Sequence, residues 1–400
     1  MSRAKPGGHL LGKPGSRTIR TGSLTISLSA RVSQVDDYDA GLAFFLDQGW
    51  TDGNPIVLPT EEKVKSVLEL VGHEPQEIVA KSRDRNRTIR VEQVVINSVM
   101  AGCTAREVPV VIAAVQSLLS DGMRHNYVAS VGGPWPFFIV SGPIVSEIGL
   151  NYDQYVLGPG ARTNSVIARA ISLVCWNCLD QRPGGVQRGA FGSSQRNESI
   201  LPERPDGPWT QLNEDRGYSK DTSTVTAYPA TGFEQVLVHL LDTPEHILAP
   251  IVDALSTGRF IWGPYVLVLP PNMVAVFVEA GWTKTKVIEY VVENTKRSVA
   301  ELKLRTRWAE QQPGPWSDLL EVKEGDRELM VYMFKSQPEL YNIAFRDKFL
   351  DSRDPELLVV NSGGDSGPCA YVLIPNTESG PVPVTTPIAQ IKSAIGARLE

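Results

Sequence analysis

The 400-residue sequence is poor in the residues that build disulfide frameworks, metal centres and membrane spans. It has only 4 cysteines and 5 histidines. Its longest apolar runs, such as Pro136–Val140 and Tyr265–Leu269, have strand length, whereas a membrane-spanning helix needs about 20 apolar residues. Cysteines this sparse are typical of a reduced intracellular protein. We therefore expect a soluble cytoplasmic protein with no membrane partner and no metal site.

An excess of basic charge is also missing. The formal net charge is −6 at pH 7, and no stripe of Lys and Arg runs through the folded part. Nucleic acid is therefore excluded as the main partner, because its phosphates are bound by clustered basic residues. A local site can still bind a small anion. We expect a small anionic ligand, a homo-oligomer such as a homodimer, and no cofactor, since no nucleotide-binding signature is present.

Acidic residues are absent before Asp36, where six basic residues occur among many Ser and Gly. This composition predicts a disordered leader over residues 1–35. The alternative is a mitochondrial transit peptide, which would place the protein in the mitochondrial matrix. Pro6 and Pro14 disfavour the amphipathic helix that such a peptide requires.

The length favours two domains, and two stretches share one order of segments. Each has a Glu-Gln-Val segment, a Pro-containing apolar helix, an apolar strand and a further helix. The first stretch comprises 91–96, 109–119, 136–140 and 144–149, and the second 233–238, 250–255, 265–269 and 273–280. Gly-Trp-Thr also recurs, at Gly49–Thr51 and Gly281–Thr283. This pattern predicts a diverged internal duplication.

The expected fold is α/β, with α+β as an alternative, in two lobes related by a pseudo-twofold axis. The lobes cover 36–180 and 233–400, and a long irregular segment rich in Gly and Pro joins them over 181–232. The cleft that two such lobes share is the natural ligand site.

Residues Gly158–Ser165 precede an apolar-periodic helix over 166–175. Thr163 or Asn164 suits the N-cap, and Arg162 with Ser165 lies beside the helix N-terminus, which attracts anions. We expect Arg162, Thr163, Asn164 and Ser165 to bind a carboxylate or phosphate. An ordinary capped helix after a turn is the alternative.

Cys103 follows Gly102 at a predicted helix junction. A thiol just before a helix N-terminus has a lowered pKa, so Cys103 is a candidate nucleophile. A small packed residue is the alternative. His125 is the leading candidate for proton transfer, and His246 could approach Cys103 if the two repeats face one another.

Three further features have weaker signals. Asp52 and Asn54 could line a pocket or only hold a turn. Gly364 and Ser366 lie in a Gly-rich turn that follows a strand and could contact a ligand. Cys175 and Cys178 form a CxxC at a helix C-terminus, where the helix dipole disfavours a thiolate, so a structural role is favoured over a redox one.

Several motifs together resemble an uncharacterised family associated with UGSC-motif selenoproteins. They are Trp50-x-Asp52-Gly53-x-Pro55, Val99–Cys103, Gly158–Gly160 and Asp221-x-Ser223-Thr224-Val225-Thr226. The resemblance covers roughly residues 40–375 and implies thiol-assisted chemistry on a small carboxylate, with Cys103 at the matching position. The chain has no UGSC motif of its own.

The sequence thus favours a small-molecule enzyme of the lyase or hydrolase type that acts on an anionic substrate between the lobes. Cys103, His125 and His246 are the expected catalytic residues. A non-catalytic ligand-binding subunit that works with a partner enzyme is the second hypothesis, and a CxxC redox protein is the third.

Overall fold

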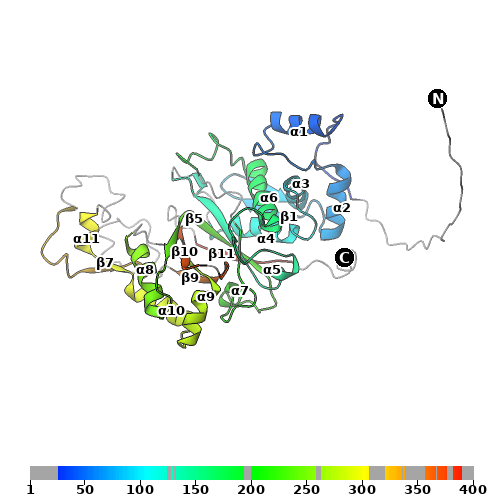
Figure 1. Ribbon diagram of the computed structural model, residues 1–400. Coiled ribbons are helices and arrows are strands. Elements are labelled where there is room, and N and C mark those ends of the chain that lie inside the picture. Colours follow the sequence, from blue (N-terminus) through cyan, green and yellow to red (C-terminus); the bar gives the residue numbers. More distant parts are fainter. Residues whose placement is uncertain are drawn as a thin grey trace, which may run out of the picture.

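A computed structural model describes residues 26–123, 128–129, 132–192, 200–257, 263–305, 320–335, 337, 356–365, 367–375 and 382–389. A seven-stranded mixed sheet occupies the middle of the molecule (Figure 1). Its strands, in spatial order, are β4 (Ile200–Pro202), β3 (Trp135–Ser141), β5 (Thr224–Leu237), β10 (Cys369–Pro375), β6 (Tyr265–Leu269) and β9 (Leu357–Asn361), and β11 (Val384–Pro387) also pairs with β5.

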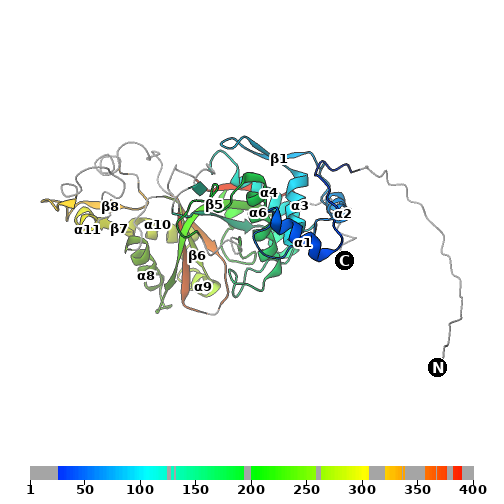
Figure 2. The same ribbon diagram turned by 90° about the horizontal axis from the view of Figure 1, so that it is seen from above.

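Two of the strand pairs are parallel, β3 with β4 and β6 with β9, and the others are antiparallel. The first half of β5 pairs with β3, and its second half pairs with β10. Helices α3 (Val91–Ala101), α4 (Val108–Leu118) and α6 (Arg162–Leu179) lie beside the β3–β4 side of the sheet, and α8 (Pro244–Thr257), α9 (Pro271–Glu279) and α10 (Lys284–Asn294) beside the β6–β9 side (Figures 1 and 2).

Smaller elements surround this framework. They are α1 (Tyr38–Asp47), α2 (Glu61–Val71), β1 (Ile78–Ser82), β2 (Arg87–Arg90), α5 (Ile144–Glu147), α7 (Leu212–Asp215), β7 (Lys296–Ser298), α11 (Val299–Leu304) and β8 (Met330–Tyr332). Figure 2 shows α1 and α2 at one end of the molecule and α11 with β7 and β8 at the other. Within the described ranges, no helix combines the length and the apolar character needed to cross a membrane.

The strands bury side chains on both faces, which explains their continuous apolar sequences. Phe138 and Val140 of β3 pack into the core that contains α3, α4 and α6, whereas Leu267 and Leu269 of β6 pack with α8 and α9. The opposite faces of both halves meet in one apolar cluster, which contains Ile139. The sheet is therefore curled, and its concave side forms a shared core.

The edge strands β4 and β9 meet at their C-terminal ends. The Arg204 N–H donates to the Asn361 carbonyl at 2.8 Å, and the Ser362 hydroxyl donates to the Pro202 carbonyl at 2.6 Å. We call the residues Glu203, Arg204, Asn361 and Ser362 the strand-end corner.

The α/β class and most element positions agree with the sequence-based expectation, but the Glu-Gln-Val correspondence is wrong. Residues 92–94 lie in helix α3, where the Gln93 side chain accepts a hydrogen bond from the Arg90 N–H. Residues 234–236 lie in strand β5, paired with β10. The same three letters form a helix start in one context and a strand in the other, because tertiary pairing overrides local propensity.

Two expected segment boundaries also need correction. The segment 181–232, expected to be irregular, contains β4, α7 and half of the central strand β5, because Thr224–Ala230 pairs with the whole of β3. In the leader, residues 1–25 lie outside the described residues. The last part of the leader is bound to helix α3, because the backbone N–H groups of Ser29 and Ala30 donate to the buried Glu92 carboxylate at 2.6–3.0 Å.

Gly142 joins β3 to α5 at a point where two backbone segments touch. Its φ is +95°, and an added Cβ would lie 2.7 Å from the Cα of Ser223. Gly149 also has a positive φ, of +68°, but an added Cβ there would have no neighbour within 4 Å.

Gly149→Ala is therefore expected to lower the free energy of unfolding by about 1 kcal/mol, from backbone strain alone. Gly142→Ala is expected to lower it by at least about 2 kcal/mol more, because the added Cβ also clashes with Ser223. Urea unfolding of both variants would measure the difference. Equal losses would show that the contact with Ser223 is not tight.

Candidate functional site

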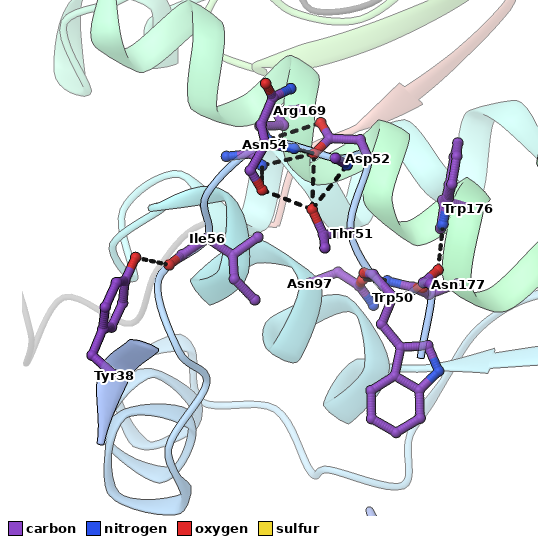
Figure 3. Close-up of polar contacts among 12 residues, drawn as sticks. Tyr38, Trp50, Thr51, Asp52, Asn54, Ile56, Asn97, Arg169, Trp176 and Asn177 are labelled. Carbon is purple, nitrogen blue, oxygen red and sulfur yellow. Dashed lines mark hydrogen bonds and ion pairs between the residues drawn. The ribbon is translucent and has the colours of Figure 1, made fainter. Parts of the chain in front are cut away.

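The loop that contains Trp50, Asp52 and Asn54 is held tightly on one face of α6 (Figure 3). Arg169 binds the Asp52 carboxylate through two hydrogen bonds, Nε to Oδ2 at 3.0 Å and Nη2 to Oδ1 at 2.8 Å. Arg169 also donates to the Asn54 carbonyl at 3.3 Å. Such a two-point contact fixes orientation as well as charge.

Two further side chains of α6, Trp176 and Asn177, bind the same loop. They lie about two helical turns after Arg169 and therefore on the same face of the helix. The Trp176 indole N–H donates to the Gly49 carbonyl at 2.8 Å, and the Asn177 amide donates to the Trp50 carbonyl at 3.0 Å (Figure 3). The loop is therefore a rigid structural unit.

Asp52 stays ionised in this arrangement. Burial alone raises its pKa, but the hydrogen bonds and positive charge of Arg169 outweigh burial and hold the pKa below its usual value. The predicted pocket role of Asp52 and Asn54 is thus replaced by an internal one, since both bind Arg169.

Cys103 lies beside the same helix but lacks the predicted lowered pKa. It is buried, and its thiol contacts the Val166 carbonyl at 3.4 Å. Burial raises the pKa of Cys103 far above its ordinary value, and the nearby Glu107 carboxylate adds to this. The positive charge of Arg162 lowers the pKa by less, so this environment does not favour the thiolate expected from the sequence.

The predicted anion site at the start of α6 is occupied by protein groups. Arg162 pairs with the buried Glu107 at 2.9 Å and also donates to the Gly102 carbonyl. The N-cap is Ala161, not Thr163 or Asn164. Asn164 is buried in the first turn and exchanges hydrogen bonds of 2.9 Å with the backbone of Asn151. Thr163 and Ser165 are partly exposed there, and the Arg162 side chain is exposed even though it is paired.

The remaining predicted residues do not join this cluster. His246 lies in α8 and pairs with Asp242 at 2.8 Å. Both views show α8, which contains His246, well apart from α3, which ends two residues before Cys103, so the two residues do not approach as expected (Figures 1 and 2). Gly364 packs against the backbone of Gln154. His125 and Ser366 lie outside the described residues.

The CxxC cysteines lie at the end of α6, as predicted, where Cys175 is buried, Cys178 is half-buried and no disulfide joins the two. Burial raises the pKa of Cys178 to about 12, which opposes the thiolate that a redox pair needs. Among the residues that the structure describes, no group of three or more His, Cys, Asp or Glu side chains could hold a metal ion.

Glu203 is the one strongly perturbed carboxyl group in the strand-end corner, and it was not among the residues predicted from the sequence. It follows β4 directly and is only 1% exposed. Its Oε2 accepts hydrogen bonds from the Ser141 hydroxyl and the Leu212 N–H, both at 2.7 Å. Within the described residues Oε1 accepts none. An acidic residue directly after a short apolar run was the available signal.

Burial raises the pKa of Glu203 to about 7, and the negative charge of Asp215 acts in the same direction. The charge of Lys284 and the two hydrogen bonds lower it and limit the shift. Lys284 is itself buried, pairs with Asp215 and donates to the Thr210 carbonyl at 3.1 Å. The carboxyl group therefore changes its charge close to neutral pH.

Arg204 and Asn361 complete the corner. Arg204 donates to the Gly363 carbonyl at 3.1 Å, and its guanidinium lies 5.0 Å from the centre of the Tyr152 ring. Its acidic partners Asp153 and Asp206 are exposed and stand 3.3 and 3.4 Å away. These pairs are weak because solvent screens them.

The Asn361 amide donates to the Leu269 carbonyl at 2.9 Å, but its buried Oδ1 has no partner in the described part of the chain. Buried polar atoms are nearly always paired, so this unpaired acceptor beside Glu203 and Arg204 is an exception in the packing of the corner.

Comparison of the chain with family models, with curated proteins and with solved structures finds no match. The resemblance to the UGSC-associated family therefore stays a prediction.

Alkylation tests the burial of Cys103. In native protein at pH 7, Cys103 is expected to react with iodoacetamide at least about a hundredfold more slowly than in urea, because the reactive thiolate is both rare and shielded. Mass spectrometry of each cysteine would measure the rates, with the less buried Cys369 as internal control. Fast labelling of Cys103 would restore the thiol hypothesis.

The pH dependence of stability tests Glu203. The unfolded chain ionises this group near the ordinary glutamate pKa of 4.5, whereas the folded chain keeps the proton until about pH 7. The folded state therefore loses stability as pH rises between these values, on the order of 3 kcal/mol in all. Glu203→Gln stays neutral and keeps an oxygen acceptor, so its stability relative to wild type is expected to rise over this window.

Urea titrations of both proteins from pH 4.5 to 8 would give the difference, in which other ionisable groups cancel. Asp52→Asn serves as the control whose difference from wild type stays constant over this range, since the Asp52 carboxyl changes its charge only below pH 3.8. A pH-independent difference for Glu203→Gln would contradict the raised pKa.

Proposed function

We propose that the protein is a small-molecule enzyme of the lyase or hydrolase type that acts on a carboxylate-bearing or otherwise anionic substrate at the strand-end corner. The observation that carries the proposal is the buried Glu203 carboxyl group, held by one oxygen at the point where β4 and β9 end. Ligands in α/β sheets commonly bind beyond the carboxyl ends of the strands.

We further propose that the two halves are the diverged internal duplication expected from the sequence. In one half, β3 has a parallel neighbour β4 on one side and antiparallel β5 on the other. In the other half, β6 has parallel β9 and antiparallel β10. Each half also contributes a strand segment that pairs with a strand of the other half. The end of β5 pairs with β10 of the second half, and β11 of the second half pairs with the start of β5.

A pseudo-twofold axis through the β5–β10 pair relates these two arrangements. The strand-end corner receives one chain segment from each half, Glu203–Arg204 from the first and Asn361–Ser362 from the second. It therefore corresponds to the shared inter-lobe site that a duplicated α/β protein uses for its ligand.

In the proposed chemistry, Glu203 transfers a proton as general acid or base. A group whose pKa lies near the working pH has both of its protonation states accessible and is efficient in this role. The Ser141 and Leu212 hydrogen bonds fix Oε2, which leaves Oε1 as the oxygen that exchanges the proton. Lys284 limits how far burial raises the pKa and so keeps it in the useful range.

Arg204 is the proposed binder of the substrate carboxylate. Its present partners are exposed acids at long distance, which a substrate carboxylate can displace in a two-point contact. Arg162, the binder expected from the sequence, already neutralises Glu107 and is not free for this role.

The alternative function is a non-catalytic ligand-binding subunit that works with a partner enzyme. The burial of Cys103 favours it, because this removes the nucleophile expected from the sequence. The paired state of Asp52 and Arg162 favours it as well, because neither is left to act on a substrate. Turnover separates the two functions.

The experiment is a screen of small 2-oxo, 2-hydroxy and 2-amino carboxylates by thermal shift, followed by ¹H NMR of the stabilising compounds in D₂O at pH 7. Wild type is expected to bind and convert at least one of them. Glu203→Gln should still bind it but lose about 10²–10⁴-fold in turnover, and Arg204→Gln should lose binding.

Cys103→Ser is the matched control and is expected to keep its turnover. Full turnover by Glu203→Gln would overturn the proposed role of the carboxyl group. Binding without any turnover by wild type would establish the ligand-binding alternative.

A further inference from the structure

Strand β5 has a free edge over its second half. On one side it pairs first with β11, over Thr224–Ala227, and then with β10, over Ala230–Leu237. On the other side β3 pairs only with Thr224–Ala230. From Gly232 to Leu237 that side has no strand partner among the described residues, so every second residue presents an unpaired N–H and C=O there.

The side chains of this edge are unusually apolar for an exposed strand. Phe233 is 38% exposed and Leu237 is 55% exposed. The Phe233 ring stacks on Tyr371 of β10, with ring centres 5.0 Å apart and planes 11° from parallel. The stack holds an exposed aromatic surface in a fixed position beside the free backbone groups.

Two of the usual protections of an edge strand, Lys and Pro, are missing here, and the one recorded bulge lies at the start of the segment, between Ala230 and Gly232. Natural edges carry Lys, Pro or bulges that block pairing with another chain. The segment 231–240 reads Thr-Gly-Phe-Glu-Gln-Val-Leu-Val-His-Leu and contains no Lys, Arg or Pro. Leu240, just beyond the strand, is also 56% exposed. Such an edge is a template for a further strand.

We propose that this edge pairs antiparallel with the same edge of a second copy of the chain, about a twofold axis that passes through Gln235. The two sheets then join into one continuous sheet across the dimer. Gln235 lies opposite its own copy, Phe233 lies opposite Leu237 of the second copy, and Glu234 lies opposite Val236.

The sequence of the edge selects this register. A twofold axis perpendicular to the sheet leaves each side chain on the same face of the joined sheet. Because side chains alternate between the two faces along a strand, an odd-numbered residue must lie opposite an odd-numbered one, and an even-numbered residue opposite an even-numbered one. An axis through Glu234 would place two carboxylates directly opposite, which is unfavourable. An axis through Val236 would place Phe233 opposite the polar His239. The axis through Gln235 pairs the exposed Phe233 and Leu237 with each other and keeps the two Glu234 carboxylates apart.

The first experiment is light scattering coupled to size-exclusion chromatography on the full chain. The expected mass at micromolar concentration is about twice the 43.8 kDa of one chain. Leu237→Lys, which places a charge opposite Phe233 of the other copy, is expected to weaken the dimer at least about tenfold. Leu304→Lys is the control, since Leu304 is 73% exposed on α11, away from the edge.

The second experiment tests the register by disulfide formation in a Cys369→Ser background. Residues directly opposite in an antiparallel pair have Cα atoms about 4.5–5.5 Å apart, within disulfide reach. Gln235→Cys is therefore expected to form a covalent dimer on mild oxidation, and Glu234→Cys is not.

A monomeric wild type, or a dimer that Leu237→Lys leaves intact and Gln235→Cys does not cross-link, would overturn the proposal. A monomer that recruits a different protein at this edge would also count against it. Cross-linking through Glu234→Cys instead of Gln235→Cys would refute the proposed register.

Discussion

The pairing of β5 with β10 and β11 is the interaction on which the rest of the structure depends. β5 is the strand that both halves share, because its first part pairs with β3 and its second part with β10. The buried Tyr228 hydroxyl reinforces this connection by hydrogen bonds to the Pro264 carbonyl at 2.8 Å and the Leu373 carbonyl at 3.1 Å. With both halves joined through one strand, their concave faces pack as one core.

The curled arrangement of the two halves also forms the strand-end corner. β4 and β9 are the outermost strands of the sheet and are far apart in sequence, yet the curl of the sheet brings their ends within hydrogen-bonding distance. Two loops that follow strands thus meet at one place. The corner contains a buried carboxyl group with a raised pKa, whereas the α6 face contains charges neutralised by their partners. The paired charges stabilise the fold, whereas a carboxyl group with a pKa near neutral pH is suited to proton transfer.

Much of the secondary structure was predictable because its signals are local. Thr60 and Gly72 bound helix α2 as N-cap and left-handed C-cap, and both residue types are local signals of helix ends. The strands around Phe138 and Leu267 were recognisable because burial on both faces produces an unbroken apolar run. The central strand β5 was not, because Gly232 interrupts it and because much of it lies in a stretch rich in turn residues.

The candidate site was less predictable, since burial and pairing depend on chain segments distant in sequence. The residue types at Asp52, Cys103 and Arg162 suggested chemistry, but Arg169, the packing around the thiol and Glu107 each changed what those groups can do. The sequence by itself determined the α/β class and the apolar strands, because these depend on neighbours a few residues away. Only the tertiary structure decided which charges are neutralised, that Glu203 is buried and that β4 meets β9, because the local dielectric and the partners of a charge come from the packing of the whole chain.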